Sequence, residues 1–158
     1  MRSLTRKIHV AAAFASFLFI AGFWTSSVFS ELLLPDSCVA TVKQAIVYAL
    51  FIFIPTMTAA GGTGFFLGGR SAHALVAAKR RRMPVIALTG LLILVPAALF
   101  LNMKAQAGEF DAAFFLVQAL ELFAGASNLT LMGMNIRDGL RLSRNRNSHE
   151  ISDALADS

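Results

Sequence analysis

A row of polar and small side chains runs through the apolar segment 112–136. It consists of Gln118, Glu121, Gly125, Asn128, Met132 and Asn135. Their spacing of three or four residues puts them on one face of a helix. The opposite face carries Phe115, Leu122 and Leu129, which suit contact with lipid. We therefore predict that the polar face turns toward the interior of a helical bundle or toward a partner subunit.

Glu121 is the residue of this face most able to carry chemistry. A carboxyl group inside a membrane is costly and marks a functional site by default. Gln118 and Tyr48 are expected at a similar depth and are predicted to form a polar site with it, while Lys43 or Lys104 could reach it as a counter-ion. Such a site could carry a proton or a cation, or contact a quinone. The alternative is a neutral, hydrogen-bonded structural glutamate, with Asn128 and Asn135 joining helices through their amides.

Two histidines suggest a different chemistry. His9 opens the first apolar segment and His73 follows the second, so antiparallel helices would bring both imidazoles to the same membrane surface. Histidines on two facing helices can ligate one haem b iron axially. The alternative is that both are ordinary residues of the membrane–water interface.

The surroundings of His73 fit a haem in principle. Gly62 and Gly69 share its helical face and would let a flat macrocycle approach closely. Three basic residues could hold the propionates: Arg70, Lys79 and Arg80. Three methionines at that depth could replace one histidine as ligand: Met83, Met132 and Met134. The glycines are equally typical of close helix packing.

Four apolar segments are long enough to cross a bilayer as helices, which takes roughly 20 residues each. They cover approximately residues 8–34, 42–69, 84–103 and 112–136. Pro55 and Pro96 fall near the middle of the second and third segments and predict kinks. Residues 1–142 would form the membrane domain, and the polar residues 143–158 a mobile tail.

The basic residues set the expected orientation. Twelve of the 14 Lys and Arg residues lie at the start of the chain, between the second and third segments, or after the fourth. The positive-inside rule then places both termini in the cytoplasm. A secretory signal ending near Ser30 is an alternative for the first segment, and its cleavage would leave three spans with the same orientation.

Composition excludes several classes of protein. The chain is 56% hydrophobic and 15% charged, whereas soluble domains carry about 25% charged residues. The net charge of +5 reflects topology and not binding to nucleic acid. Cys38 is the single cysteine, so no internal disulfide forms. Phosphate-binding loops, zinc motifs and an activated nucleophile are missing from the sequence.

One stretch of the chain resembles known bacterial proteins. KRRRMPVIALTGLLILVPAALFL and VQALELFAGASNLTLMGMNIRDGLRL, within residues 70–142, resemble a group of small four-helix inner-membrane proteins. This resemblance implies a location and a span count, and no activity. The plan is also similar to four-helix b-type cytochromes, without their usual histidine pattern inside the membrane.

We therefore expect an all-α membrane protein, an antiparallel bundle of four transmembrane helices with both termini in the cytoplasm, in the bacterial inner membrane. The leading hypothesis is a haem-b-binding protein of electron transfer or haem handling, with His9 and His73 as ligands. The alternatives are a transport or accessory protein with Glu121 as its proton or cation site, and a structural subunit of a membrane complex. The expected partners are lipid, a quinone or redox partner, and a second copy or another membrane subunit.

Overall fold

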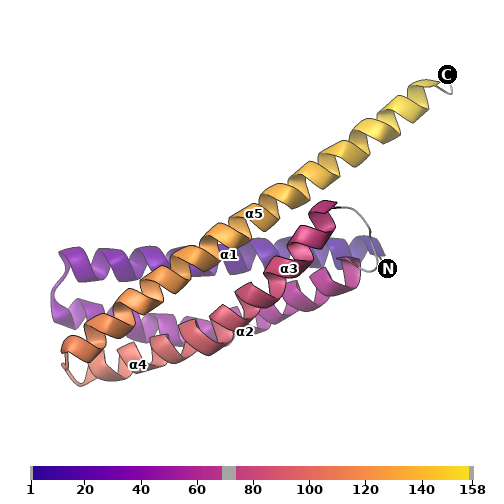
Figure 1. Ribbon diagram of the computed structural model, residues 1–158. Coiled ribbons are helices and arrows are strands. Elements are labelled where there is room, and N and C mark those ends of the chain that lie inside the picture. Colours follow the sequence, from indigo (N-terminus) through magenta and orange to yellow (C-terminus); the bar gives the residue numbers. More distant parts are fainter. Residues whose placement is uncertain (1, 69–73, 157–158) are drawn as a thin grey trace.

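The computed structural model describes residues 2–68 and 74–156, and within them every regular element is a helix (Figure 1). The elements are α1 (Arg2–Leu33), α2 (Asp36–Gly68), α3 (Ala74–Thr89), a π-helical turn (Gly90–Leu94), α4 (Val95–Gln106) and α5 (Ala112–Ala156). The turn of residues 34–35 folds α2 back along α1, and residues 107–111 join α4 to α5. Gly108 makes the second reversal possible because its φ of 71° lies in the left-handed region that glycine adopts without strain.

Four helical stretches are long and apolar enough to cross a membrane, as the sequence predicts. They are Ser3–Leu33, Asp36–Leu67, Arg81–Gln106 and Ala112–Arg141. The outside of the molecule is rich in large apolar side chains, and Phe51, Phe65 and Phe123 are each about three-quarters exposed. Such a surface suits lipid tails rather than water, so the chain is a multi-pass membrane protein.

The interior is built mainly where α1, α2 and α5 meet the α3–α4 stretch. Its central cluster consists of Ile20, Ile46, Leu50, Phe53, Ile86, Ala98 and Met132. Phe19, Phe23 and Phe53 pack against one another in tilted and edge-to-face arrangements, with ring centroids 5.7–6.1 Å apart. A smaller cluster of Val39, Leu101, Ala105 and Phe114 lies near the α4–α5 turn. Figure 1 shows α5 crossing the other helices obliquely and extending beyond them.

The third transmembrane stretch is interrupted near Pro96. Proline has no N–H and its ring crowds the carbonyl four residues earlier. The helix widens just before it into the π-helical turn, where the N–H of Val95 donates to the carbonyl of Gly90. Wide turns of this kind are rare and often lie at functional sites.

The end of the chain differs from the prediction. The sequence predicts a mobile tail from residue 143, whereas α5 continues to Ala156. Residues 143–156 contain neither proline nor glycine and include good helix formers, so nothing in them ends the helix that the membrane stretch begins.

Candidate functional site

Lys43 is the most unusual buried residue of the described chain. It lies seven residues after the start of α2, about 10 Å along the helix axis. Its side chain is only 1% exposed and is among the largest that are fully buried. Burying an ammonium group is very costly unless it is paired and hydrogen-bonded, so its neighbours must supply compensating oxygen atoms.

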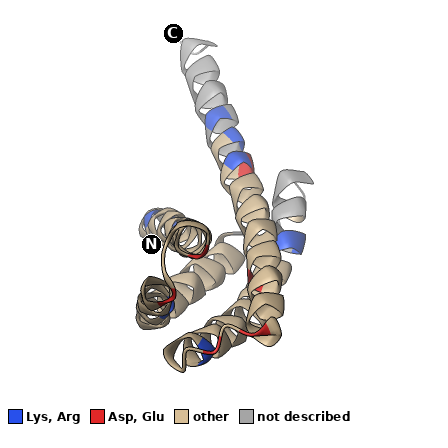
Figure 2. Ribbon diagram, turned by 90° about the vertical axis from the view of Figure 1, so that its left-hand side faces the viewer, with Lys and Arg blue, Asp and Glu red and all other residues tan. Residues whose placement is uncertain are grey.

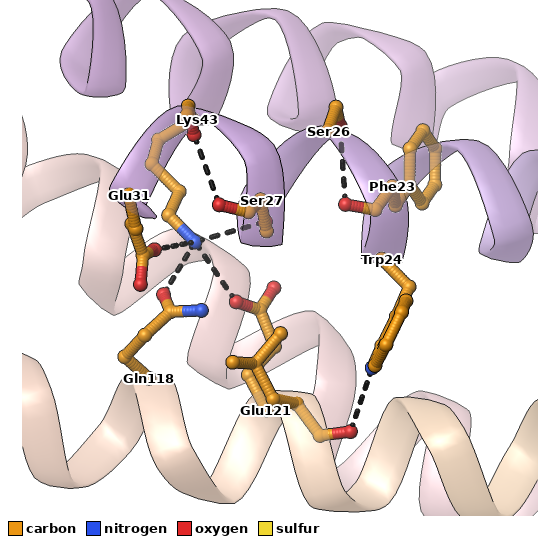
Figure 3. A network of polar contacts seen from close by, with 10 residues as sticks. Phe23, Trp24, Ser26, Ser27, Glu31, Lys43, Gln118 and Glu121 are labelled. Atoms are coloured by element: carbon orange, nitrogen blue, oxygen red, sulfur yellow. Dashed lines mark hydrogen bonds and ion pairs between the residues drawn. The ribbon is translucent and has the colours of Figure 1, made fainter. Parts of the chain in front are cut away.

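Four oxygen atoms from two other helices surround this ammonium group (Figure 3). Lys43 Nζ lies 3.1 Å from Oε1 of Glu31 and 3.0 Å from Oε2 of Glu121. It also donates hydrogen bonds to Oγ of Ser27, at 3.0 Å, and to Oε1 of Gln118. We call these five residues the Lys43 cluster. One lysine of α2 thus joins α1, which carries Ser27 and Glu31, to α5, which carries Gln118 and Glu121.

The helical spacing explains why these side chains converge. Ser27 and Glu31 are four residues apart and share one face of α1, and Gln118 and Glu121 are three apart on α5. Ser27 and Gln118 are buried, and the two carboxyl side chains are 15% and 12% exposed. The Lys43 cluster therefore holds two carboxyl groups and one ammonium group at the edge of the protein interior.

A small cavity adjoins the Lys43 cluster. Its volume is about 40 Å³, and its wall includes Ser27 and Glu121 together with Ile20, Phe23, Trp24, Ile46, Leu50, Phe53, Leu94, Val95, Ala98, Leu122 and Gly125. The Trp24 indole N–H donates to the carbonyl of Leu122 at 2.9 Å, which fixes the ring against α5. Gly125 permits this approach, since a Cβ there would lie 3.0 Å from Cδ1 of Trp24.

The rest of the polar face of α5 is divided between two other places. Asn128 is fully buried, and its Nδ2 donates to the carbonyl of Ile86 at 3.3 Å. Further along, Arg82 Nη1 lies 2.7 Å from Oδ2 of Asp138 and 3.5 Å from Oδ1 of Asn135. The six-residue face predicted from the sequence is thus turned inward, but its polar side chains contact different groups at separate places along α5.

Two other predicted participants lie elsewhere. Tyr48 is 63% exposed, and its hydroxyl accepts a hydrogen bond from Gln44 at 3.1 Å, outside the Lys43 cluster. Lys104 pairs with Glu109 at 2.6 Å and with Asp111 at 2.8 Å in the α4–α5 turn. Of the two lysines considered as counter-ions for Glu121, the structure places Lys43 beside it.

His9 is buried between helices. Its Nδ1 lies 3.0 Å from the carbonyl oxygen of Ala60 and 3.2 Å from Oγ1 of Thr63. Its ring packs so closely on Gly64 that a Cβ there would lie 2.8 Å from Cε1 of the imidazole. The imidazole therefore makes a close helix–helix contact between α1 and α2.

Most residues of the haem hypothesis lie around His73, outside the described part of the chain. Gly69, Arg70 and His73 lie outside the described residues, as do the side chains of Lys79 and Arg80. Gly62 is exposed, a Cβ added to it would meet no atom within 4 Å, and it lies about 200° around α2 from Gly64. The face of α2 that carries Gly62 is thus turned away from His9, and the iron site stays a prediction.

Sequence reasoning missed Glu31, Ser27 and Asp138 as site residues. Glu31 stands three residues from Leu34, so it reads as an ordinary flanking charge of the first span. The signal in the sequence that could have found two of them is the i, i+4 spacing of Ser27 and Glu31 on one helix face.

Comparisons with protein-family models, with curated proteins and with solved structures find no match to this chain.

Proposed function

We propose that this chain is a proton-binding membrane transport or accessory protein whose site is the Lys43 cluster. The observation that carries the proposal is that one buried ammonium group is shared by two carboxyl groups, those of Glu31 and Glu121. With both carboxyl groups ionised, the cluster has an excess negative charge. Charge inside a membrane protein is costly unless it is balanced, so binding of one cation is favoured.

A proton fits this demand better than a metal ion. The centre of the Lys43 cluster is already occupied by an ammonium group, and a sodium or potassium ion beside it would meet a like charge. A proton on either carboxyl group neutralises the excess charge without displacing Lys43. Gln118 and Ser27 can hydrogen-bond to the ammonium group in both protonation states.

Infrared titration of the purified protein in lipid vesicles tests this function. The protonated carboxyl group should give a C=O stretching band that disappears as the pH rises, and Glu121→Gln or Glu31→Gln should remove or shift it. Glu109→Gln, in the exposed turn, is the matched control and should leave this band unchanged. A band that is the same in wild type and in both cluster variants would overturn the proposal.

The same proposal includes an orientation in the bacterial inner membrane. The four spans would cross in alternating directions as an antiparallel bundle, with both termini in the cytoplasm. Described basic residues lie on α3 and on the distal part of α5 (Figure 2), where Arg82 of α3 pairs with Asp138 of α5. The positive-inside rule favours this end as cytoplasmic. Reporter fusions at the two termini should both report the cytoplasm, and opposite locations would contradict the orientation.

Haem b binding is a second candidate, favoured by one feature of His9. A histidine whose Nδ1–H donates to a backbone carbonyl keeps its Nε2 lone pair in the tautomer that ligates metals. Ala60 provides such a carbonyl at 3.0 Å. This candidate needs His73 as its second ligand, and an absorption spectrum tests it.

A further inference from the structure

Positive charge is concentrated where α3 packs against the distal part of α5. The described side chains there include four arginines: Arg81, Arg82, Arg137 and Arg141. Asp138 is the only acidic residue in α3 or in residues 122–149 of α5. It is buried and pairs with Arg82 at 2.7 Å and with Arg137 at 3.6 Å. Four arginines and one carboxylate leave a net charge of +3, which favours an anionic partner.

The pair of Arg82 and Asp138 fixes how the two helices face each other. α3 and α5 run in opposite directions, because the contact of Asn128 with the carbonyl of Ile86 lies further along α3 but earlier on α5 than this pair. Successive residues of a helix are rotated by about 100°. Between antiparallel helices, the residues directly before each member of a facing pair are therefore turned toward the same side.

Arg81 and Arg137 are these two preceding residues, so both point to one side of the α3–α5 pair. Arg141 lies four residues after Arg137 and shares its helix face. All three are exposed. Within the described part of the chain, neither Arg81 nor Arg141 forms an ion pair. We call these three residues the arginine surface, and its guanidinium groups have donors available for an anion.

The arginine surface lies at the depth of lipid headgroups. The third apolar stretch begins at Arg81, and the fourth ends at Arg141. These residues therefore mark the boundary between the hydrocarbon layer and the lipid phosphate groups. Guanidinium groups bind phosphate through two parallel hydrogen bonds, and basic pockets between transmembrane helices bind anionic lipid headgroups. A lipid phosphate is thus the anion that this position favours.

An exposed apolar face continues from the arginine surface into the membrane. Val85, Leu88 and Leu92 follow Arg81 at spacings of four, three and four residues, which places them on its side of the helix. Their exposed fractions are 51%, 56% and 64%. The same face of one helix thus offers a guanidinium group at the headgroup level and apolar side chains further in, as an acyl chain requires.

This face ends at an open groove between the third stretch and α5. The groove has a volume of about 270 Å³, and its wall is formed by apolar residues that include Leu92, Phe100 and Leu120. Leu92 lies eleven residues beyond Arg81, which is about 16 Å along a helix. One half of a hydrocarbon core of about 30 Å has nearly this thickness. An acyl chain that starts at the arginine surface therefore reaches the groove.

We propose that the outward side of α3 and α5 binds one anionic phospholipid. Its phosphate rests on the arginine surface, and one acyl chain follows Val85 and Leu88 to the groove at Leu92. A zwitterionic lipid such as phosphatidylcholine is disfavoured, because its ammonium group would meet the net positive charge of the arginines. No residue of the Lys43 cluster takes part, so this lipid site and the proposed proton site are tested separately.

Native mass spectrometry of the full-length protein in detergent tests the lipid site. The detergent contains equal amounts of phosphatidylglycerol and phosphatidylcholine with the same acyl chains, and the wild type should retain mainly phosphatidylglycerol. Arg81→Gln and Arg141→Gln should each lower the ratio of the two retained lipids by about five-fold, the contribution expected of one arginine near anionic lipid. The two residues lie on different helices and outside ion pairs, so either variant decides the matter if the other does not fold.

Lys7→Gln is the matched control. Lys7 is exposed near the start of α1, at the same end of the bundle, since His9 and Met83 both lie against Gly64. The lipid ratio should be unchanged in this variant. Equal retention of both lipids by the wild type, or an equal fall in Lys7→Gln and Arg81→Gln, would overturn the site. Displacement of the retained lipid by inorganic phosphate at equal concentration would also overturn it, because the anion would then bind without its acyl chain.

Discussion

Nζ of Lys43 in α2 lies 3.0 Å from Oε2 of Glu121 in α5, and it is almost fully buried. The same nitrogen pairs with Glu31 in α1, so the side chain of Lys43 connects three helices. In a membrane, where apolar contact between helices gains little over contact with lipid, such polar contacts also help to specify which helices pack together. The cluster therefore has a structural consequence that can be measured apart from proton binding.

Lys43→Met should strongly destabilise the protein. The change leaves two carboxyl groups facing each other without a cation, and removing one partner of a buried ion pair costs about 3–5 kcal/mol. Thermal unfolding in detergent should show a clear loss, and Lys43→Met combined with Glu31→Gln and Glu121→Gln should recover much of it. Lys104→Met is the control, because its partners in the turn are more than half exposed. Equal losses of thermal stability in Lys43→Met and Lys104→Met would show that the buried Lys43 cluster stabilises the protein no more than the ion pairs of the turn do.

The sequence predicts the spans well because lipid imposes a simple physical requirement. Long apolar runs must be helical to satisfy their backbone groups, and the four helical stretches match the four predicted segments. The inward face of α5 also follows from spacing alone, and Gln118, Asn128 and Asn135 are buried as that spacing implies.

Partners across helices could not be read from the sequence in the same way. Tyr48 and Lys43 are both polar residues in the first half of α2, but they are five residues apart, which is about 140° around the helix. Only the packing of α1 against α2 decides which of them faces Glu121. The sequence does not single out Asp138, because its partner Arg82 is 56 residues away along the chain.

Asp111 should make the start of α5 sensitive to acid. Hydrogen bonding to the Lys104 ammonium group, and then to the N–H of Phe114, holds the pKa of the Asp111 carboxyl group below its usual 3.8. A lowered pKa means that the stabilising contribution is complete above pH 3.8 and is lost as the pH falls below that value. The melting temperature of wild type should therefore drop more steeply than that of Asp111→Asn in this range. Parallel curves for the two proteins would rule out a role for this carboxyl group.

Haem binding predicts a coloured protein. If His9 and His73 ligate one iron, protein purified after expression with ample haem should show a Soret band that His9→Ala abolishes. His149→Ala is the control, since that residue lies beyond the membrane stretch of α5. Colourless wild-type protein would remove the haem candidate and leave the proton site untouched, because His9 is not a member of the Lys43 cluster.

Gly125→Ala should disturb the only tryptophan of the chain. The added Cβ would lie 3.0 Å from Cδ1 of Trp24, and the indole cannot yield without lengthening its 2.9 Å hydrogen bond to the carbonyl of Leu122. Overpacking of this kind costs about 1–3 kcal/mol. Because Trp24 also lines the cavity, both its fluorescence emission maximum and the melting temperature of the protein should change.

Gly133→Ala is the matched control on the same helix, since a Cβ there meets no atom within 4 Å. It should leave the emission unchanged and, because alanine favours helix, leave stability equal or slightly higher. Identical emission spectra for Gly125→Ala and wild type would mean that Trp24 does not contact Gly125. The wall of the cavity beside Glu121 would then differ from the one described above.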